Sequence, residues 1–153
     1  MTDSVTPSSP FLLRRLAAMV YDTLLVLPLI MASVAVFMGM RTLVMGGPGE
    51  GEVVQLNPYL VQLIALLTVI GFFCWFWLKN GQTLGMQAWR IKLVKFDGGQ
   101  PSWQQTVKRC LFALLSAACL GLGYLWCLVD SKGRYWHDYL SGTELILLPA
   151  KTK

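Results

Sequence analysis

Residues 11–40 of this chain have the sequence FLLRRLAAMVYDTLLVLPLIMASVAVFMGM, and this stretch decides the fold. From Leu16 to Met40 the only charged side chain is that of Asp22. A run of about 20 apolar residues is what a helix needs to cross the hydrocarbon core of a bilayer. An ionised carboxylate near the middle of a lone spanning helix costs roughly 2.5–3.5 kcal/mol on insertion scales, so it normally faces protein or water and has a partner. The stretch therefore predicts a spanning helix that carries a buried charged site.

Arg15 is the nearest candidate partner for Asp22. Seven residues make about two helical turns, which place both side chains on one helix face roughly 10 Å apart along the axis. In one interpretation, Asp22 is a coordinating or proton-carrying group in a solute path, as intramembrane acids often are. In another, the two charges lock the first helix against its neighbours, because removing one partner of a buried ion pair is costly. Binding of a lipid or a partner is a third interpretation, and all three stay open.

Two further uncharged runs, Val53–Leu78 and Cys110–Val129, extend the membrane pattern. Hydrophobic residues form 55% of the 153 residues and charged residues 14%, against about 25% charged in a typical soluble domain. We expect an all-α polytopic membrane protein with two full transmembrane helices, Leu12–Met40 and Tyr59–Leu78. The third segment is expected to break at Gly121–Gly123, because each glycine weakens a helix by about 1 kcal/mol.

The distribution of lysine and arginine bears on the orientation. If residues 110–129 dip into the membrane and return, twelve of the 13 basic side chains lie on one side and Arg41 alone lies on the other. If the segment crosses, the division is eight to five. A lysine and arginine excess marks the cytoplasmic side, which favours the re-entrant form with a cytoplasmic N-terminus. Twenty uncharged residues also suffice for an ordinary span, so whether this segment crosses stays open.

Shorter signals lie between and after the apolar runs. Residues 81–90 are expected to contain a short interfacial helix, and Ser102 with Gln105 forms a capping-box pattern before the third run. Residues 91–96 and 145–148 have strand character and are expected to pair as a small cytoplasmic hairpin-like element, because an isolated strand is not stable. The chain is thus interpreted as one membrane domain at 11–148, with a flexible tail at 1–10, a loop at 46–52 and a short tail at 149–153.

Several function classes are disfavoured. The net charge of +5 sits at segment ends rather than on a basic helix with interleaved aromatics, so nucleic-acid binding is not expected. The four cysteines lie in apolar runs without a C-x-x-C pair, which offers no metal site or disulfide framework. His137 is the only histidine and is interpreted as a surface or helix-cap residue, with proton relay as the alternative. We therefore expect no enzymatic activity, no metal and no cofactor.

Three elements in order resemble the RDD family of bacterial membrane proteins, which is named for one arginine and two aspartates. The first is Arg15 with Asp22 in the first helix, and the second is Gly81-Gln82-Thr83-Leu84-Gly85, followed by the strand and turn. The third is His137-Asp138 with Gly142-Thr143, and the glycine-containing Gly121–Tyr124 also fits. The resemblance covers about residues 10–148.

The resemblance implies a polytopic protein of the bacterial cytoplasmic (inner) membrane with a suggested role in transport. Its charged site would consist of Arg15, Asp22 and Asp138, with Arg14, Asp130 and His137 as lesser candidates. We expect Asp138 to fold back near Arg15 or Arg14. The expected function is a transporter or transport subunit for a small solute or ion. With so few helices it would form a homo-oligomer or bind a membrane protein partner within the lipid bilayer. The alternative is a non-transporting interaction or assembly module in which the Arg/Asp set is structural.

Overall fold

The computed structural model describes residues 9–47, 49 and 56–149. Most of the expected N-terminal tail, much of the loop at 46–52 and the last four residues therefore lie outside the described residues. Two long helices dominate the chain, α1 (Leu12–Met45) and α2 (Pro58–Asn80). Helix α1 continues five residues beyond its expected end, and α2 adds one residue at its start and two at its end. Helix α1 also runs through Pro28 without ending there.

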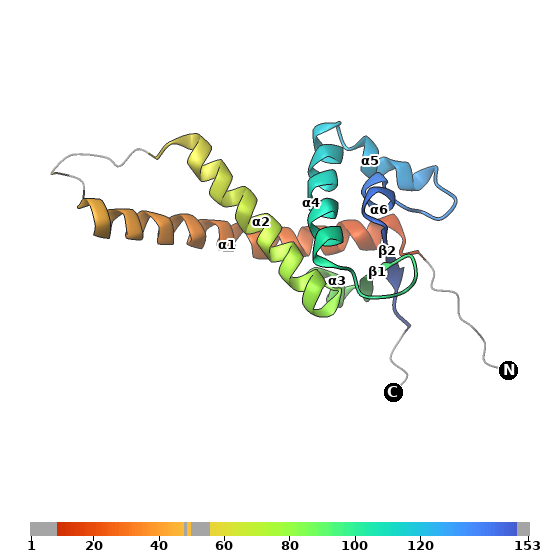
Figure 1. Ribbon diagram of the computed structural model, residues 1–153. Helices are drawn as coiled ribbons and strands as arrows, with labels where there is room; N and C mark the ends of the chain where they lie inside the picture. The colour runs from red at the N-terminus through yellow and green to blue at the C-terminus, as the bar shows by residue number, and fades with distance from the viewer. Residues whose placement is uncertain (1–8, 48, 50–55, 150–153) are drawn as a thin grey trace. The chain divides into compact units, whose positions relative to one another are not determined.

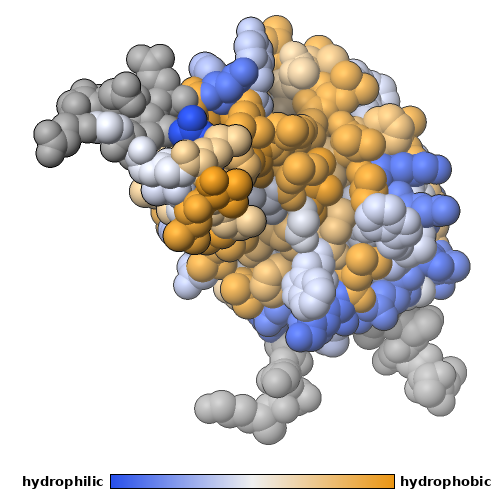
Figure 2. Space-filling view, turned by 60° about the vertical axis from the view of Figure 1, so that its left-hand side comes forward, coloured by the Kyte–Doolittle hydropathy of each residue, from blue (hydrophilic) through white to orange (hydrophobic). Residues whose placement is uncertain are grey.

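Both long helices meet the length and hydropathy of a membrane span. Only 6% of the most apolar window of α1 and 11% of that of α2 is buried within the chain. Apolar surface of this extent requires an apolar surrounding, which a bilayer supplies. Figure 2 shows hydrophobic residues gathered over much of the face in view, with hydrophilic residues toward its borders.

The chain divides into two compact units. One unit is Thr23–Phe72, which holds the greater part of both long helices and exposes side chains such as those of Leu24 and Met31. The other unit combines the residues up to Asp22 with those from Phe73 onward. All the residues that the sequence singles out as a charged site belong to this second unit.

Short elements build the second unit (Figure 1). In chain order they are α3 (Leu84–Ala88), β1 (Ile91–Lys95), α4 (Trp103–Ala118), α5 (Leu122–Leu125), the 3-10 helix η1 (Trp126–Leu128), α6 (Trp136–Ser141) and β2 (Thr143–Leu147). Strands β1 and β2 pair antiparallel, with Ile91 opposite Leu147 and Lys95 opposite Thr143. The expected pairing is confirmed, although the two strands are not a hairpin, because α4, α5 and α6 lie between them in the chain. Ile91 and Leu93 in β1 are among the most buried apolar residues.

The third apolar run is broken where the glycines predict it. Helix α4 starts with the expected capping box of Ser102 and Gln105 and ends at Ala118. The chain then turns through Leu120 and Gly121, both with positive φ, and the following helical residues lie at 106° to α4. Gly123 packs against α4 so closely that a Cβ there would lie 2.7 Å from the Cβ of Ser116. The described residues thus hold two span candidates, or three if the bent pair is one span.

Candidate functional site

Arg15 and Asp22 lie on one face of α1, as their spacing predicts. Both are 3% exposed, as is Ala18 between them, whereas Leu16, Met19 and Tyr21 are exposed. Arg14 precedes Arg15 and is only half-buried. The buried residues Arg15, Ala18 and Asp22 are thus three and four positions apart, as expected for one face of a helix.

A cradle from the start of α3 holds the carboxylate of Asp22. The Thr83 hydroxyl donates to Oδ2 of Asp22 at 2.5 Å, and the backbone N–H of Gly85 donates to Oδ1 at 2.9 Å. Thr83 is also the N-cap of α3 and accepts a hydrogen bond from the N–H of Met86. A Cβ at position 85 would lie 2.9 Å from Oδ1 of Asp22 and closer still to the carbonyl oxygen of Ala18. The Gly81–Gly85 element therefore needs threonine for its hydroxyl and glycine at 85 for the close approach of α1.

Arg15, the candidate partner of Asp22, makes no ion pair with it in the described part of the chain. Among the described residues, no lysine or arginine lies within 4 Å of the Asp22 carboxylate, whose hydrogen-bond donors are both neutral. A buried charge without a counter-charge is expensive to keep ionised. Asp22 is thus a buried acid in a span candidate with two neutral hydrogen bonds.

Arg15 makes a different set of contacts. Its Nε donates to the carbonyl oxygen of Pro10 at 3.0 Å, and its Nη2 donates to the hydroxyl of Ser9 at 2.6 Å. The guanidinium lies over the ring of Tyr135, with Cζ 4.6 Å from the ring centroid. Its Nη1 is buried and makes no hydrogen bond to the described residues. Arg15 therefore has neutral partners on every side that the structure describes.

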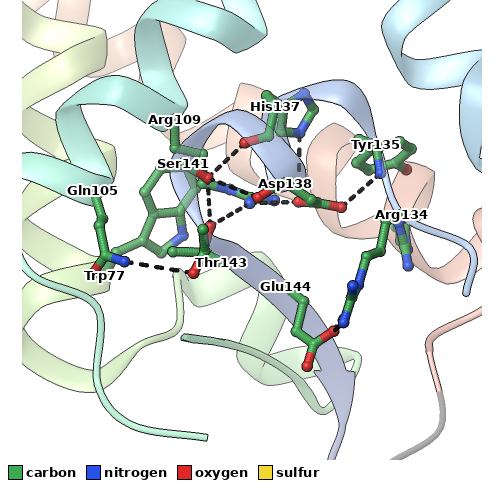
Figure 3. Close-up of polar contacts among 12 residues, drawn as sticks. Trp77, Gln105, Arg109, Arg134, Tyr135, His137, Asp138, Ser141, Thr143 and Glu144 are labelled. Atoms are coloured by element: carbon green, nitrogen blue, oxygen red, sulfur yellow. Dashed lines mark hydrogen bonds and ion pairs between the residues drawn. The ribbon is translucent and has the colours of Figure 1, made fainter. Parts of the chain in front are cut away.

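Asp138 forms an ion pair with Arg109 (Figure 3). Its Oδ1 lies 2.5 Å from Nη1 of Arg109, and its Oδ2 accepts a hydrogen bond from the N–H of Tyr135 at 2.7 Å. The same Nη1 donates to the Thr143 hydroxyl at 2.9 Å. This network joins α4, α6 and β2 through one fully buried carboxylate. Tyr135 connects Asp138 with Arg15. Its N–H donates to Asp138, and its ring lies against the Arg15 guanidinium.

Arg109 is a site residue that the sequence interpretation missed, because it was counted only as an orientation charge. Its guanidinium is buried and lies over the Trp77 ring at 5.4 Å from the centroid. The buried residues of α4 are Thr106, Arg109, Cys110 and Ser116. Their spacing places these four residues on one helix face. This polar stripe, at the start of the third apolar run, was the sequence signal that Arg109 is buried and needs a partner.

His137 is buried, which corrects the expectation of a surface or cap residue. The rings of Tyr124 and Tyr135 lie 5.1 and 4.9 Å from its ring. Burial, followed by the positive charges of Arg109 and Arg15, lowers the pKa of His137 to about 2. A pKa in this range favours the neutral imidazole at physiological pH.

Asp130 has a local role in the turn before α6. Its Oδ2 accepts hydrogen bonds from the N–H groups of Lys132 and Arg134, and its Oδ1 accepts one from the Tyr139 hydroxyl. The bond from the Arg134 N–H is the main cause that lowers the pKa of Asp130. Arg134 pairs in turn with Glu144. Asp130, a lesser candidate for the charged site, is therefore bonded locally within this turn and to α6.

No group of three or more histidine, cysteine, aspartate or glutamate side chains in the described part of the chain is arranged to hold a metal ion. Among the described residues, the buried carboxylates are those of Asp22 and Asp138. Of these, Asp138 is already neutralised by a cation, whereas Asp22 is not.

Comparison with known proteins identifies the family of the chain. The model of the RDD family matches residues 9–142, a range that includes Arg15, Asp22, Thr83, Arg109 and Asp138. Neither the curated proteins nor the solved structures yield a match. The family match covers most of the chain and both of its apolar helices, which together indicate a membrane protein. The chain belongs to the RDD family.

Proposed function

We propose that this protein is a transporter or transport subunit for a small solute or ion, in which Asp22 takes up and releases a proton or a cation. One observation carries the proposal. Asp22 is a buried carboxylate in a span candidate, and the described residues offer it a hydroxyl and a backbone N–H but no cation. Intramembrane acids with this environment commonly mark ion or proton pathways.

The cradle accepts both charge states of Asp22. When the acid is ionised, the Thr83 hydroxyl and the Gly85 N–H both donate to it. When it is protonated, its own O–H can donate to the Thr83 oxygen, because a hydroxyl is both donor and acceptor. Gly85 continues to donate to the other oxygen. A change of charge therefore reverses one hydrogen bond without breaking the contact between α1 and α3.

The setting that we propose is the bacterial inner membrane with a cytoplasmic N-terminus. The distribution of lysine and arginine supports this orientation, because positive charge favours the cytoplasmic side. Two or three spans enclose too little space for a solute path. The exposed apolar faces of α1 and α2 support assembly with further copies or with a membrane protein partner.

Flux into vesicles tests the proposal. The chain is reconstituted and assayed with H⁺, Na⁺ and K⁺ gradients, as wild type and as Asp22→Asn. Asparagine keeps an oxygen that accepts from Gly85 and an amide that donates to Thr83, so the variant is expected to fold but to lose flux. Asp97→Asn is the matched control, because Asp97 is exposed and bonds only within its own turn. Undiminished flux through Asp22→Asn at equal protein content would refute the proposal.

One observation favours a second candidate, a non-transporting interaction or assembly module. Asp22 and Asp138 are both bonded within the chain, and the pocket beside Arg15 is not lined by Asp22. In this function the Arg/Asp set fastens α3 and α6 to their neighbours and the module binds a membrane partner. It predicts no flux from the purified protein and a co-purifying partner that is lost in Arg15 or Asp138 variants.

A further inference from the structure

A pocket of about 720 Å³ lies beside Arg15, within the unit that carries the charged residues. The start of α1, the end of η1, the turn at 130–134 and β2 form its walls. Its polar lining includes Ser9, Arg15, Asp130, Lys132, Arg134 and Glu144. None of the contacts of Asp22 takes part in this pocket.

The carboxylates of the pocket are already engaged by other groups. Glu144 accepts hydrogen bonds from the Arg134 guanidinium, and Asp130 accepts three from Lys132, Arg134 and Tyr139. Lys132 forms no ion pair with a described carboxylate. The three cations Arg15, Lys132 and Arg134 exceed the two carboxylates of Asp130 and Glu144 by one, so the net charge of the pocket is positive.

Arg15 is the strongest indication that this pocket binds an anion. An arginine side chain does not deprotonate in proteins. Here it is almost fully buried, yet among the described residues no carboxylate lies within 4 Å and no group hydrogen-bonds to its Nη1. A buried cation is normally paired with an anion, because an uncompensated charge is strongly destabilising. A planar guanidinium with free donors suits bidentate binding of phosphate oxygens.

The apolar rim of the pocket bears on the source of that anion. Phe11 and Leu128 line the pocket and are 84% and 66% exposed. A pocket that combines charged side chains with exposed apolar ones fits an amphiphile, with a phosphate at Arg15 and acyl chains along Phe11 and Leu128. We propose that this pocket binds a phosphate group at Arg15, presented by an anionic membrane lipid or as free phosphate.

The proposal does not rest on transport, because it concerns binding at Arg15 and not exchange at Asp22. The test uses the purified full chain in a neutral detergent and titration calorimetry with three probes. These are short-chain phosphatidylglycerol, inorganic phosphate, and a diacylglycerol of equal chain length that lacks phosphate. Saturable binding of either phosphate-bearing probe, without binding of the diacylglycerol, is expected. Tighter binding of phosphatidylglycerol identifies a lipid as the source, and equal or tighter binding of inorganic phosphate identifies the free anion.

Variants assign the binding to this pocket. Arg15→Gln is expected to weaken it by about tenfold or more, because a charge-assisted hydrogen-bond pair is lost. Lys132→Gln at the exposed rim weakens it by about fivefold at most, as expected for an exposed charge. Lys108→Gln removes an exposed lysine that is not part of the pocket and leaves the affinity unchanged.

A second variant, expected to raise the phosphate affinity, keeps the test valid if Arg15→Gln does not fold. Glu144→Gln removes a negative charge from the pocket and releases the Arg134 guanidinium, so it is expected to tighten phosphate binding. If neither phosphate-bearing probe binds, or if the diacylglycerol binds equally, the proposal is wrong. It is also wrong if Lys132→Gln and Glu144→Gln bind with the affinity of Lys108→Gln.

Discussion

The ion pair between Arg109 and Asp138 is expected to be the most important polar contact for stability. Both side chains are almost inaccessible, and Oδ1 of Asp138 lies 2.5 Å from Nη1 of Arg109. Asp138→Asn keeps the shape and an oxygen that accepts from Tyr135, but it leaves the Arg109 charge without a counter-charge. Breaking a buried pair by removing one partner costs about 3–5 kcal/mol.

The matched control is Glu144→Gln, the same chemical change in the pair with Arg134. Its side chains are 15% and 24% exposed, so solvent screens the pair and the loss is about 0–1 kcal/mol. For a chain of this size, 1 kcal/mol shifts the thermal midpoint by about 2–4 °C. Asp138→Asn should therefore lower the midpoint by about 6–20 °C in detergent, and Glu144→Gln by less than about 4 °C.

A double variant separates lost charge pairing from lost packing. Arg109→Met with Asp138→Leu removes both charges, and apolar replacement of a buried pair is often neutral or stabilising. The double variant should thus unfold at a higher temperature than either single variant. Circular dichroism in a heated detergent solution measures wild type, Asp138→Asn, Glu144→Gln, the double variant and its two single variants. If Asp138→Asn unfolds within about 1 °C of Glu144→Gln, the reasoning on burial is refuted.

Three further outcomes follow from particular contacts. Gly85→Ala should reduce the thermal midpoint and the folded yield, because the added Cβ meets α1, whereas Gly71→Ala has nothing within 4 Å and should not. Gly123→Ala should destabilise the turn between α4 and α5 through contact with Ser116, and proteolysis at that turn should become faster. His137 is neutral when folded but binds a proton below about pH 6.5 when unfolded. The stability that the neutral His137 contributes is complete above that pH and is lost toward acid by up to about 1.4 kcal/mol per pH unit. The thermal midpoint of His137→Gln should therefore fall less steeply between pH 7 and 5 than that of wild type.

The two long apolar helices, the two strand segments and the broken third run could be predicted because their signals are local. Uncharged runs of spanning length indicate α1 and α2, and the alternation of apolar residues after Arg90 indicates β1. The capping residue Ser102 marks the start of α4. Gly121, which adopts a positive φ, marks the turn after it. Each of these features depends on residues within a few positions of one another.

The partners of the charged residues could not be predicted in the same way. Asp22 meets Thr83 and Gly85, which are 61 and 63 positions away in the chain. Arg15 lies on the expected face of α1 but seven positions from Asp22, too far along the helix axis for a direct contact. Sequence spacing identifies which side chains are buried, whereas contacts between distant segments decide which of them meet.

The burial of His137 was missed for a related reason. A single histidine next to an aspartate in a short aromatic segment gives no periodic signal. Its burial results from the packing of α6 on α4, where the aromatic rings of Tyr124 and Tyr135 enclose it. The polar stripe of α4 was a sequence signal for the burial of Arg109. It could be used only once the structure showed that this face of α4 is buried.

Infrared difference spectroscopy of the reconstituted protein tests most directly whether Asp22 exchanges charge. Spectra of wild type and Asp22→Asn are recorded while the pH and the Na⁺ concentration are varied separately. The account predicts a carboxyl band, present in wild type and missing in Asp22→Asn, whose intensity changes with one of these two variables. A band of Asp22 that stays constant across both titrations would contradict the exchange of a proton or cation at this residue.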